Sequence, residues 1–227
     1  MHSVQLVASS SWAINQAKMS SLFKNFEKSL IYYPLDETFF KPRNKKLIRE
    51  NLNIPIDKKV IFLGAHQIRD PRKGIDFAIK SLALLYRDLS ESEREKIAII
   101  TAGNKDLNSL IKFRCFHFGI VSSNVLAELY SSSDIFLCSS VEDNGPMMIN
   151  EAVLSGCAIV SFNVGVSQDL VSSENGYLAE NFNEHDLFLG LKKVLNSDML
   201  YFSKTSREIG MKYLTKKVIS KSWKKIL

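Results

Sequence analysis

Short apolar runs alternate with amphipathic stretches along most of this chain. The runs have the length and residue types of buried strands, and they span residues 59–64, 96–102, 114–118, 134–138, 158–162 and 176–179. After the first run, apolar residues recur at helical spacing from Gly74 to Leu85. This alternation predicts an α/β fold in which one parallel sheet carries helices on both faces, a doubly wound arrangement.

The fourth apolar run is followed by a segment with the properties of a ligand site. Ser139 to Gly145 has turn chemistry, and Pro146 suits the first position of a helix, where a missing N–H costs little. The amides of Met147 and Met148 would then point from the helix start toward the carboxyl end of the strand, where open α/β sheets bind ligands. We therefore expect phosphate oxygens at this helix start.

Two carboxylates flank the same helix start. Asp143 and Glu151 lie eight residues apart, one in the turn and one inside the helix, so both can face a ligand docked there. They would accept hydrogen bonds from hydroxyl groups rather than hold the phosphates. Ordinary turn punctuation is the alternative interpretation for the turn taken in isolation.

A basic turn, RDPRKG, follows the first apolar run. Lys73, together with either Arg69 or Arg72, would neutralise a diphosphate leaving group near the carboxyl end of that strand. Gly64 would let the phosphates approach the main chain. The alternative interpretation is a solvated basic turn without a ligand.

The order of these segments resembles a known family. The pattern E-D-N-x-P-x-x-x-x-E-A-x-x-x-G-x-x-x-V is similar to the acidic-x7-Glu signature of retaining, nucleotide-sugar-dependent glycosyltransferases with the GT-B architecture, here as Asp143 to Glu151. The resemblance extends to residues 62–82 and 116–140. It implies that the chain is the Rossmann-like, donor-binding C-terminal half of such an enzyme, with a remnant of the N-terminal half.

The resemblance also implies roles for individual residues. Asp143 would contact the donor sugar, Glu151 the nucleotide ribose, and the intervening amides the diphosphate. The catalytic candidates are Asp143, Lys73 and Arg72. The substrate-binding candidates are Gly64, Arg69, Gly145, Pro146, Met147, Met148 and Glu151. No metal or other cofactor is expected, because the four histidines are scattered and the cysteines have no close-pair spacing.

The chain departs from the family pattern in three places. Gly165 is followed by Val166 where a second glycine is common, with Asp169 at the position where an acidic residue is usual. The segment between the two halves reads Tyr33-Pro34 instead of Asn-Pro, and Asn150 replaces an apolar residue.

Three regions follow from these patterns. Residues 1–46 are expected to hold a remnant of the acceptor-side domain and the interdomain connector, with a short strand from Val4 to Ala8 and an amphipathic stretch containing Trp12 and Phe23. Residues 47–198 form the predicted nucleotide-sugar-binding domain. Residues 199–227 form a basic C-terminal helical segment.

Charge is concentrated in that last segment. Residues 199–227 carry eight Lys or Arg and one acid, a net charge of +7, whereas the whole chain of 227 residues carries +6. The resemblance implies that this segment packs back onto the other half. A basic surface for anionic lipid is the alternative, and nucleic acid is not expected as a partner because no reading motif is present.

The expected location is the cytoplasm, with a possible peripheral position at the inner membrane face. No apolar run reaches membrane-spanning length, and the start of the chain lacks a basic region followed by an apolar core. Cys115, Cys138 and Cys157 are odd in number and mostly flanked by apolar residues, which is typical of reduced thiols.

The sequence therefore predicts a hexosyltransferase-like enzyme that moves a sugar from a nucleotide diphosphate sugar to a carbohydrate or lipid-linked acceptor, with retention. A bacterial surface polysaccharide pathway is the setting that the resemblance implies. One alternative is a truncated or split module that binds nucleotide sugar, or a partner chain carrying the N-terminal half, without turnover. A basic peripheral-membrane interaction protein is the other alternative, and it depends on the C-terminal segment alone.

Overall fold

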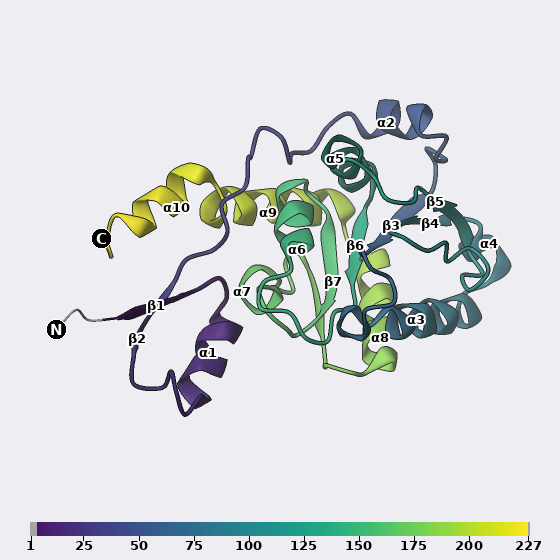
Figure 1. Cartoon of the computed structure of the whole chain (residues 1–227). Helices are drawn as coiled ribbons and strands as arrows, with labels where there is room; N and C mark the ends of the chain where they lie inside the picture. Colours follow the sequence, from purple (N-terminus) through teal and green to yellow (C-terminus); the bar gives the residue numbers. More distant parts are fainter. Residues whose placement is uncertain (1–3, 227) are drawn as a thin grey trace.

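A computed structural model of the protein describes residues 4–226, and its centre is a six-stranded parallel sheet (Figure 1). The strand order is β5-β4-β3-β6-β7-β8. The strands are β3 (Lys59–Gly64), β4 (Ile97–Ala102), β5 (Arg114–His117), β6 (Ile135–Cys138), β7 (Ala158–Phe162) and β8 (Gly176–Ala179). All six predicted strands are confirmed, with bounds that differ by no more than one residue.

Helices cover both faces of this sheet, so the doubly wound prediction is confirmed. Side chains alternate between the faces along β3: Ile61 and Leu63 belong to one apolar core, and Val60 and Phe62 to the other. Helix α3 (Ile75–Asp88) and helix α8 (Glu184–Leu195) pack on the first face and against each other. Helix α5 (Ser123–Ser132) and helix α6 (Met147–Leu154) pack on the second. Strands buried on both faces read as continuous apolar runs, which explains why the sequence revealed them.

The remaining helices are short connectors or belong to the two ends of the chain. They are α1 (Ser11–Met19), α2 (Lys45–Asn51), α4 (Glu91–Arg94), α7 (Ser167–Leu170), α9 (Met199–Tyr213) and α10 (Lys216–Trp223). A 3₁₀ turn, Pro71–Lys73, precedes α3. Among residues 4–226, no helix has both the length and the apolar character needed to cross a membrane.

The N-terminal residues form a small unit beside the main sheet. Strand β1 (Gln5–Ala8) pairs in parallel with β2 (Glu27–Leu30), and α1 connects the two strands. We predicted β1 but not β2, because the sequence EKSL contains a single apolar residue and gives no strand signal. The boundary expected at residue 46 falls within α2, so the polar connector ends in a helix.

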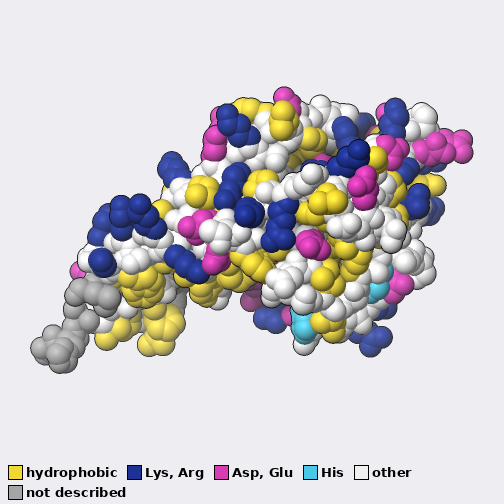
Figure 2. All heavy atoms as spheres, turned by 90° about the horizontal axis from the view of Figure 1, so that it is seen from above, with side chains coloured by type: hydrophobic (Ala, Val, Ile, Leu, Met, Phe, Trp, Pro, Cys, Tyr) yellow, Lys and Arg dark blue, Asp and Glu magenta, His cyan; other side chains and the backbone are white. Residues whose placement is uncertain are grey.

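The basic C-terminal segment is helical and folds back along the molecule. Helix α9 packs on α6, and Arg207 donates hydrogen bonds to the carbonyl oxygens of Phe40, Leu154 and Glu37 at 2.7–2.9 Å. In α10, Ile219 is buried, while the lysines of the opposite side are exposed. Figure 2 shows Lys and Arg side chains gathered over the end of the molecule that carries α10.

Candidate functional site

The carboxyl ends of β3 and β6 open into a cavity of about 320 Å³. Residues from three segments line it: the end of β3, the 3₁₀ turn, and the loop from β6 into α6. Its lining includes Gly64, His66, Lys73, Ser139, Ser140, Asp143, Gly145, Pro146, Met147 and Met148. The structure thus brings together most of the residues that the sequence placed at this edge, and parallel strand ends of open sheets are where such folds bind ligands.

Lys73 and Asp143 form an ion pair in this cavity, with 2.7 Å between Nζ and Oδ2. The second carboxylate oxygen of Asp143 accepts a hydrogen bond from the Gly145 amide at 3.2 Å. About a third of the Lys73 side chain is exposed to solvent (33 %), so a ligand can reach its ammonium group. The pair places one cation and one hydrogen-bond acceptor at the same point of the cavity wall.

The turn that carries Lys73 is fixed to the loop after β6. The Ser139 hydroxyl donates to the Lys73 carbonyl oxygen at 2.9 Å, and the Val141 amide donates to the Arg72 carbonyl oxygen at 2.9 Å. Gly74 has a φ of 59°, and a Cβ at this position would lie 2.0 Å from the Ser139 carbonyl oxygen. Only glycine fits such a close approach, so the Lys-Gly pair is required by the path of the backbone.

Helix α6 begins at the cavity. Pro146 is its N-cap residue and Met147 its first residue, which corrects the prediction that Pro146 occupies the first helical position. The shift is one residue, because the Pro146 carbonyl oxygen already accepts the first helical bond from Ile149 N at 2.9 Å. A helix start leaves its first amides without partners inside the helix, and the side chain of Pro146 cannot cap them. These amides and the helix dipole favour an anion here.

Glu151 lies one turn further along α6, at a second cavity of about 210 Å³. Its Oε2 accepts a hydrogen bond from the hydroxyl group of the buried Tyr130 at 2.9 Å. Burial raises the pKa of Glu151 to about 7, although the bond from Tyr130 acts in the opposite direction. The two cavities adjoin, because Met147 and Met148 line both of them.

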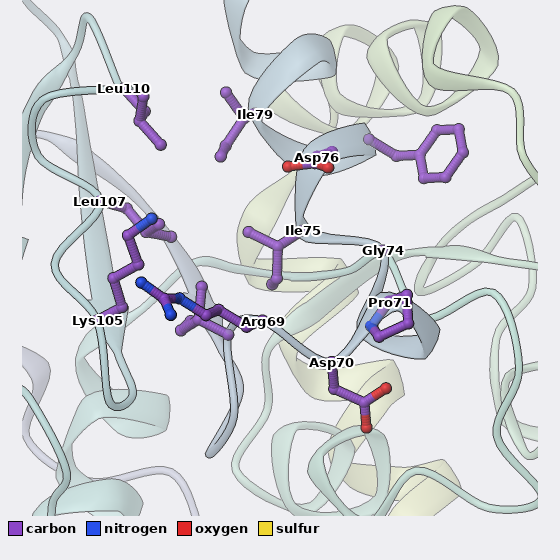
Figure 3. Close-up of a pocket in the computed structure, with 12 residues that line it drawn as sticks. Arg69, Asp70, Pro71, Gly74, Ile75, Asp76, Ile79, Lys105, Leu107 and Leu110 are labelled. Carbon is purple, nitrogen blue, oxygen red and sulfur yellow. The ribbon is translucent and has the colours of Figure 1, made fainter.

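The two arginines of the basic turn lie away from the Lys73 cavity. Arg72 pairs with Asp70 at 2.8 Å, and 64 % of its side chain is exposed. Arg69 lines a neighbouring cavity of about 420 Å³, where its side chain lies beside that of Lys105 (Figure 3). Neither arginine contributes to the described lining of the cavity shared by Lys73 and Asp143. Their role at a diphosphate stays a prediction.

The sequence did not reveal a contact between the N-terminal unit and the turn that carries Asp143. The Ser10 hydroxyl donates to the Asn144 carbonyl oxygen, and the Ser11 amide donates to Asp169 Oδ2 at 2.9 Å. The run of three serines before Trp12 signals a helix start. No feature of the sequence indicates that this helix start contacts a loop more than 130 residues further along the chain.

Gly165 also packs closely against the turn that carries Asp143. It has a φ of 59°, and a Cβ there would lie 2.3 Å from the Asp143 carbonyl oxygen. Val166, which follows where a second glycine is common in the resembled family, is buried.

Within residues 4–226, no group of three or more His, Cys, Asp or Glu side chains is arranged to hold a metal ion. The three cysteines are free thiols.

Comparison with known proteins gives a consistent result. The model of the family described as "Glycosyl transferases group 1" matches residues 57–197. A Haemophilus influenzae protein described as an uncharacterized glycosyltransferase is 30% identical over 193 residues, which cover 80% of this chain and 52% of that protein. The chain spans between 38% and 52% of the length of the curated relatives that it matches.

Solved structures share the fold at lower identity. Sucrose-phosphate synthase from Thermosynechococcus elongatus superposes with a TM-score of 0.81 at 17% identity, covering 98% of this chain and 57% of that one. Anabaena HepE in complex with UDP and glucose superposes with a TM-score of 0.75 at 17% identity, covering 97% and 62%. The fold of the chain matches GT-B glycosyltransferases, which confirms the Rossmann-like fold class.

Proposed function

This chain belongs to the group 1 glycosyltransferases, and from that premise we propose that it binds a nucleotide diphosphate sugar at the carboxyl edge of its six-stranded sheet. The main support for this proposal is the arrangement of two adjoining cavities. A cavity with an ion pair and a helix start adjoins a cavity with a buried carboxylate, and Met147 and Met148 line both. Together the two cavities offer separate places for the sugar and phosphates and for the nucleoside.

The diphosphate would bind between Lys73 and the start of α6. Its negative charge would replace Asp143 as the partner of the Lys73 ammonium group, and the first amides of α6 would donate to its oxygens. This arrangement can stabilise the charge that develops on the diphosphate as the bond to the sugar breaks. No step of this account requires a metal ion.

The release of Asp143 from Lys73 would leave its carboxylate to accept hydrogen bonds from sugar hydroxyl groups. Glu151 would do the same for the ribose hydroxyls in the second cavity. We infer retention of configuration from the acidic-x7-Glu motif alone. Arg72 would have to leave Asp70 before it could reach the diphosphate, so we assign it a smaller catalytic role than Lys73.

The acceptor is proposed to be a carbohydrate or a lipid-linked carbohydrate, held by a second wall that residues 4–226 do not provide. Transfer requires donor and acceptor in one water-excluding cleft. In the described part of the chain the N-terminal unit has two strands, and Leu22 and Phe23, between α1 and β2, are exposed. We therefore expect these 227 residues, as a verified monomer, to show little or no sugar transfer. Robust transfer by the monomer would contradict this expectation and would place an acceptor site within this chain.

A second candidate function is a binding module that acts with a partner chain carrying the other half. The chain spans about half the length of the curated relatives that it matches, which favours this candidate. Assays of the chain alone and with candidate partner chains separate the two functions. The expected setting is a cytoplasmic polysaccharide pathway. Any contact of α10 with a membrane would involve its exposed lysines and Trp223, because Ile219 is buried against the protein.

Isothermal titration calorimetry tests the proposed function. UDP-glucose, GDP-mannose and ADP-glucose would be titrated into the full chain, and the best ligand into Glu151→Ala. A carboxylate that accepts ribose hydroxyl bonds contributes about 1.5 to 3 kcal/mol, so the variant should bind at least about tenfold more weakly. An unchanged dissociation constant in the folded variant would refute the ribose assignment, and the absence of any binding would refute the function.

A further inference from the structure

The corner between β1 and α1 packs behind the Asp143–Gly145 turn, which lines the cavity shared by Lys73 and Asp143, the donor cavity. Ser9 and Ser10 are buried there. The Ser10 hydroxyl accepts a hydrogen bond from the Ala13 amide at 3.1 Å, as the N-cap of α1, and donates to the Asn144 carbonyl oxygen. A serine hydroxyl has a single proton to donate. Here that proton goes to the Asp143–Gly145 turn, while the hydroxyl oxygen caps the start of α1.

Two hydrogen bonds from Ser11 also hold the corner against α7. The Ser11 hydroxyl and amide both donate to the carboxylate of Asp169, the amide at 2.9 Å. A negative charge at the start of α1 is also favoured by the helix dipole. Gly145 lies so close that a Cβ there would be 2.8 Å from Ser9 Oγ. Both the serine corner and Gly165 therefore lie in close contact with the turn.

We propose that Ser10 and Asp169 are positioning residues for the sugar end of the donor, an inference that rests on the nucleotide-sugar function proposed above. They touch no ligand themselves. Ser10 bonds directly to the turn whose Asp143 side chain pairs with Lys73 and whose Gly145 lines the cavity. Asp169 acts one step further away, because it holds the neighbouring Ser11. A shift of this turn changes the position of the Asp143 carboxylate, and hydrogen bonds weaken steeply with small changes of distance and angle.

The nucleoside end of the site has no direct hydrogen bond to this corner. Glu151 lies on α6 and is held by Tyr130 of α5. The residues that line its cavity come from other segments than the N-terminal unit. Loss of the Ser10 hydroxyl should therefore weaken binding of the sugar part while leaving binding of the nucleoside part nearly unchanged. A residue that only supports the fold would weaken both parts alike.

The test compares Ser10→Ala with the wild-type full chain by calorimetry. The ligands are the nucleotide sugar that binds best in the panel above and the corresponding nucleoside monophosphate. Loss of one hydrogen bond predicts about a threefold to tenfold weaker affinity for the nucleotide sugar. The affinity for the monophosphate should change by less than about twofold. Ser10→Thr keeps the hydroxyl group and should restore the affinity.

Thr215→Ala serves as the matched control. Thr215 is the N-cap residue of α10, where its hydroxyl accepts from the Val218 amide at 3.3 Å, and it does not line the donor cavity. This variant loses a helix cap without a contact to the site turn. It should leave both affinities unchanged. Equal losses of both affinities in Ser10→Ala would overturn the positioning role, as would an unchanged affinity for the nucleotide sugar.

Amide hydrogen exchange, measured without ligand, tests the positioning role of Ser10 independently of the proposed function. The Gly145 amide donates to the side chain of Asp143 within the turn, so its exchange reports on the order of the turn. Ser10→Ala should accelerate exchange at residues 143–145, and Thr215→Ala should not. If the wild-type chain binds no nucleotide sugar, the proposed function fails. Unchanged exchange in Ser10→Ala would then still refute the positioning role.

Discussion

Replacement of Glu151 by glutamine should stabilise the protein at alkaline pH while weakening its ligand site. Burial raises the pKa of Glu151 from an ordinary value of 4.5 to about 7. Between these two values the folded state holds a proton that the unfolded state has released. The stability of the wild type therefore falls as the pH rises through this window, and the loss is complete above about pH 7.

The size of the effect follows from the shift. One pKa unit corresponds to about 1.4 kcal/mol, so a raise from 4.5 to about 7 costs the folded state about 3 kcal/mol at alkaline pH. A neutral glutamine avoids this cost. Its carbonyl oxygen can still accept the hydrogen bond from Tyr130 that Glu151 accepts now.

Urea unfolding of the wild type and Glu151→Gln from about pH 5 to about pH 8.5 measures the prediction. The difference in the free energy of unfolding should be small at the acidic end and should grow to about 3 kcal/mol in favour of the variant at the alkaline end. Glu50→Gln, at an exposed position of α2, is the control and should show no such growth. A difference that stays constant with pH would refute the reasoning.

Three further predictions, tested with five variants, concern other parts of the account. In calorimetric titrations, Lys73→Ala should weaken binding of a nucleoside diphosphate far more than binding of the nucleoside, and added salt should reduce the difference between the two losses of affinity. Arg69→Ala should weaken binding of the diphosphate less than Lys73→Ala does. Gly165→Ala should lower the free energy of unfolding by roughly 1 to 3 kcal/mol through backbone strain, plus the clash with the carbonyl oxygen 2.3 Å away. Gly119→Ala has a similar φ of 66° but open space around its Cβ, so it should cost less than Gly165→Ala when the two variants are compared by thermal unfolding. Arg207→Ala leaves three carbonyl oxygens without their donor and should cost at least about 2 kcal/mol by urea unfolding.

The parallel sheet could be predicted because strands buried on both faces leave continuous apolar runs. The same rule explains why β2 was missed: its sequence EKSL is mostly polar, and it becomes a strand by pairing with β1. The start of α6 was placed one residue early, since a proline is compatible with both the N-cap and the first helical position.

The candidate site could be predicted in part. The local turn chemistry around Asp143 and Lys73 identified a site at each of two strand ends, and the fold brings the two together. Three-dimensional contacts decide the rest. The contact of Ser10 with Asn144 joins segments that are 134 residues apart, and the contact of Ser11 with Asp169 joins segments that are 158 residues apart. Such long-range contacts leave no periodic signal in a single sequence.

A crystal structure of the chain with a bound nucleotide diphosphate sugar tests the central claim most directly. We predict the diphosphate at the start of α6, within hydrogen-bond distance of the Met147 or Met148 amide and of Lys73 Nζ, with the Lys73–Asp143 pair opened and the ribose at Glu151. A ligand bound in the cavity of Arg69 and Lys105, with the Lys73–Asp143 pair intact, would contradict the account.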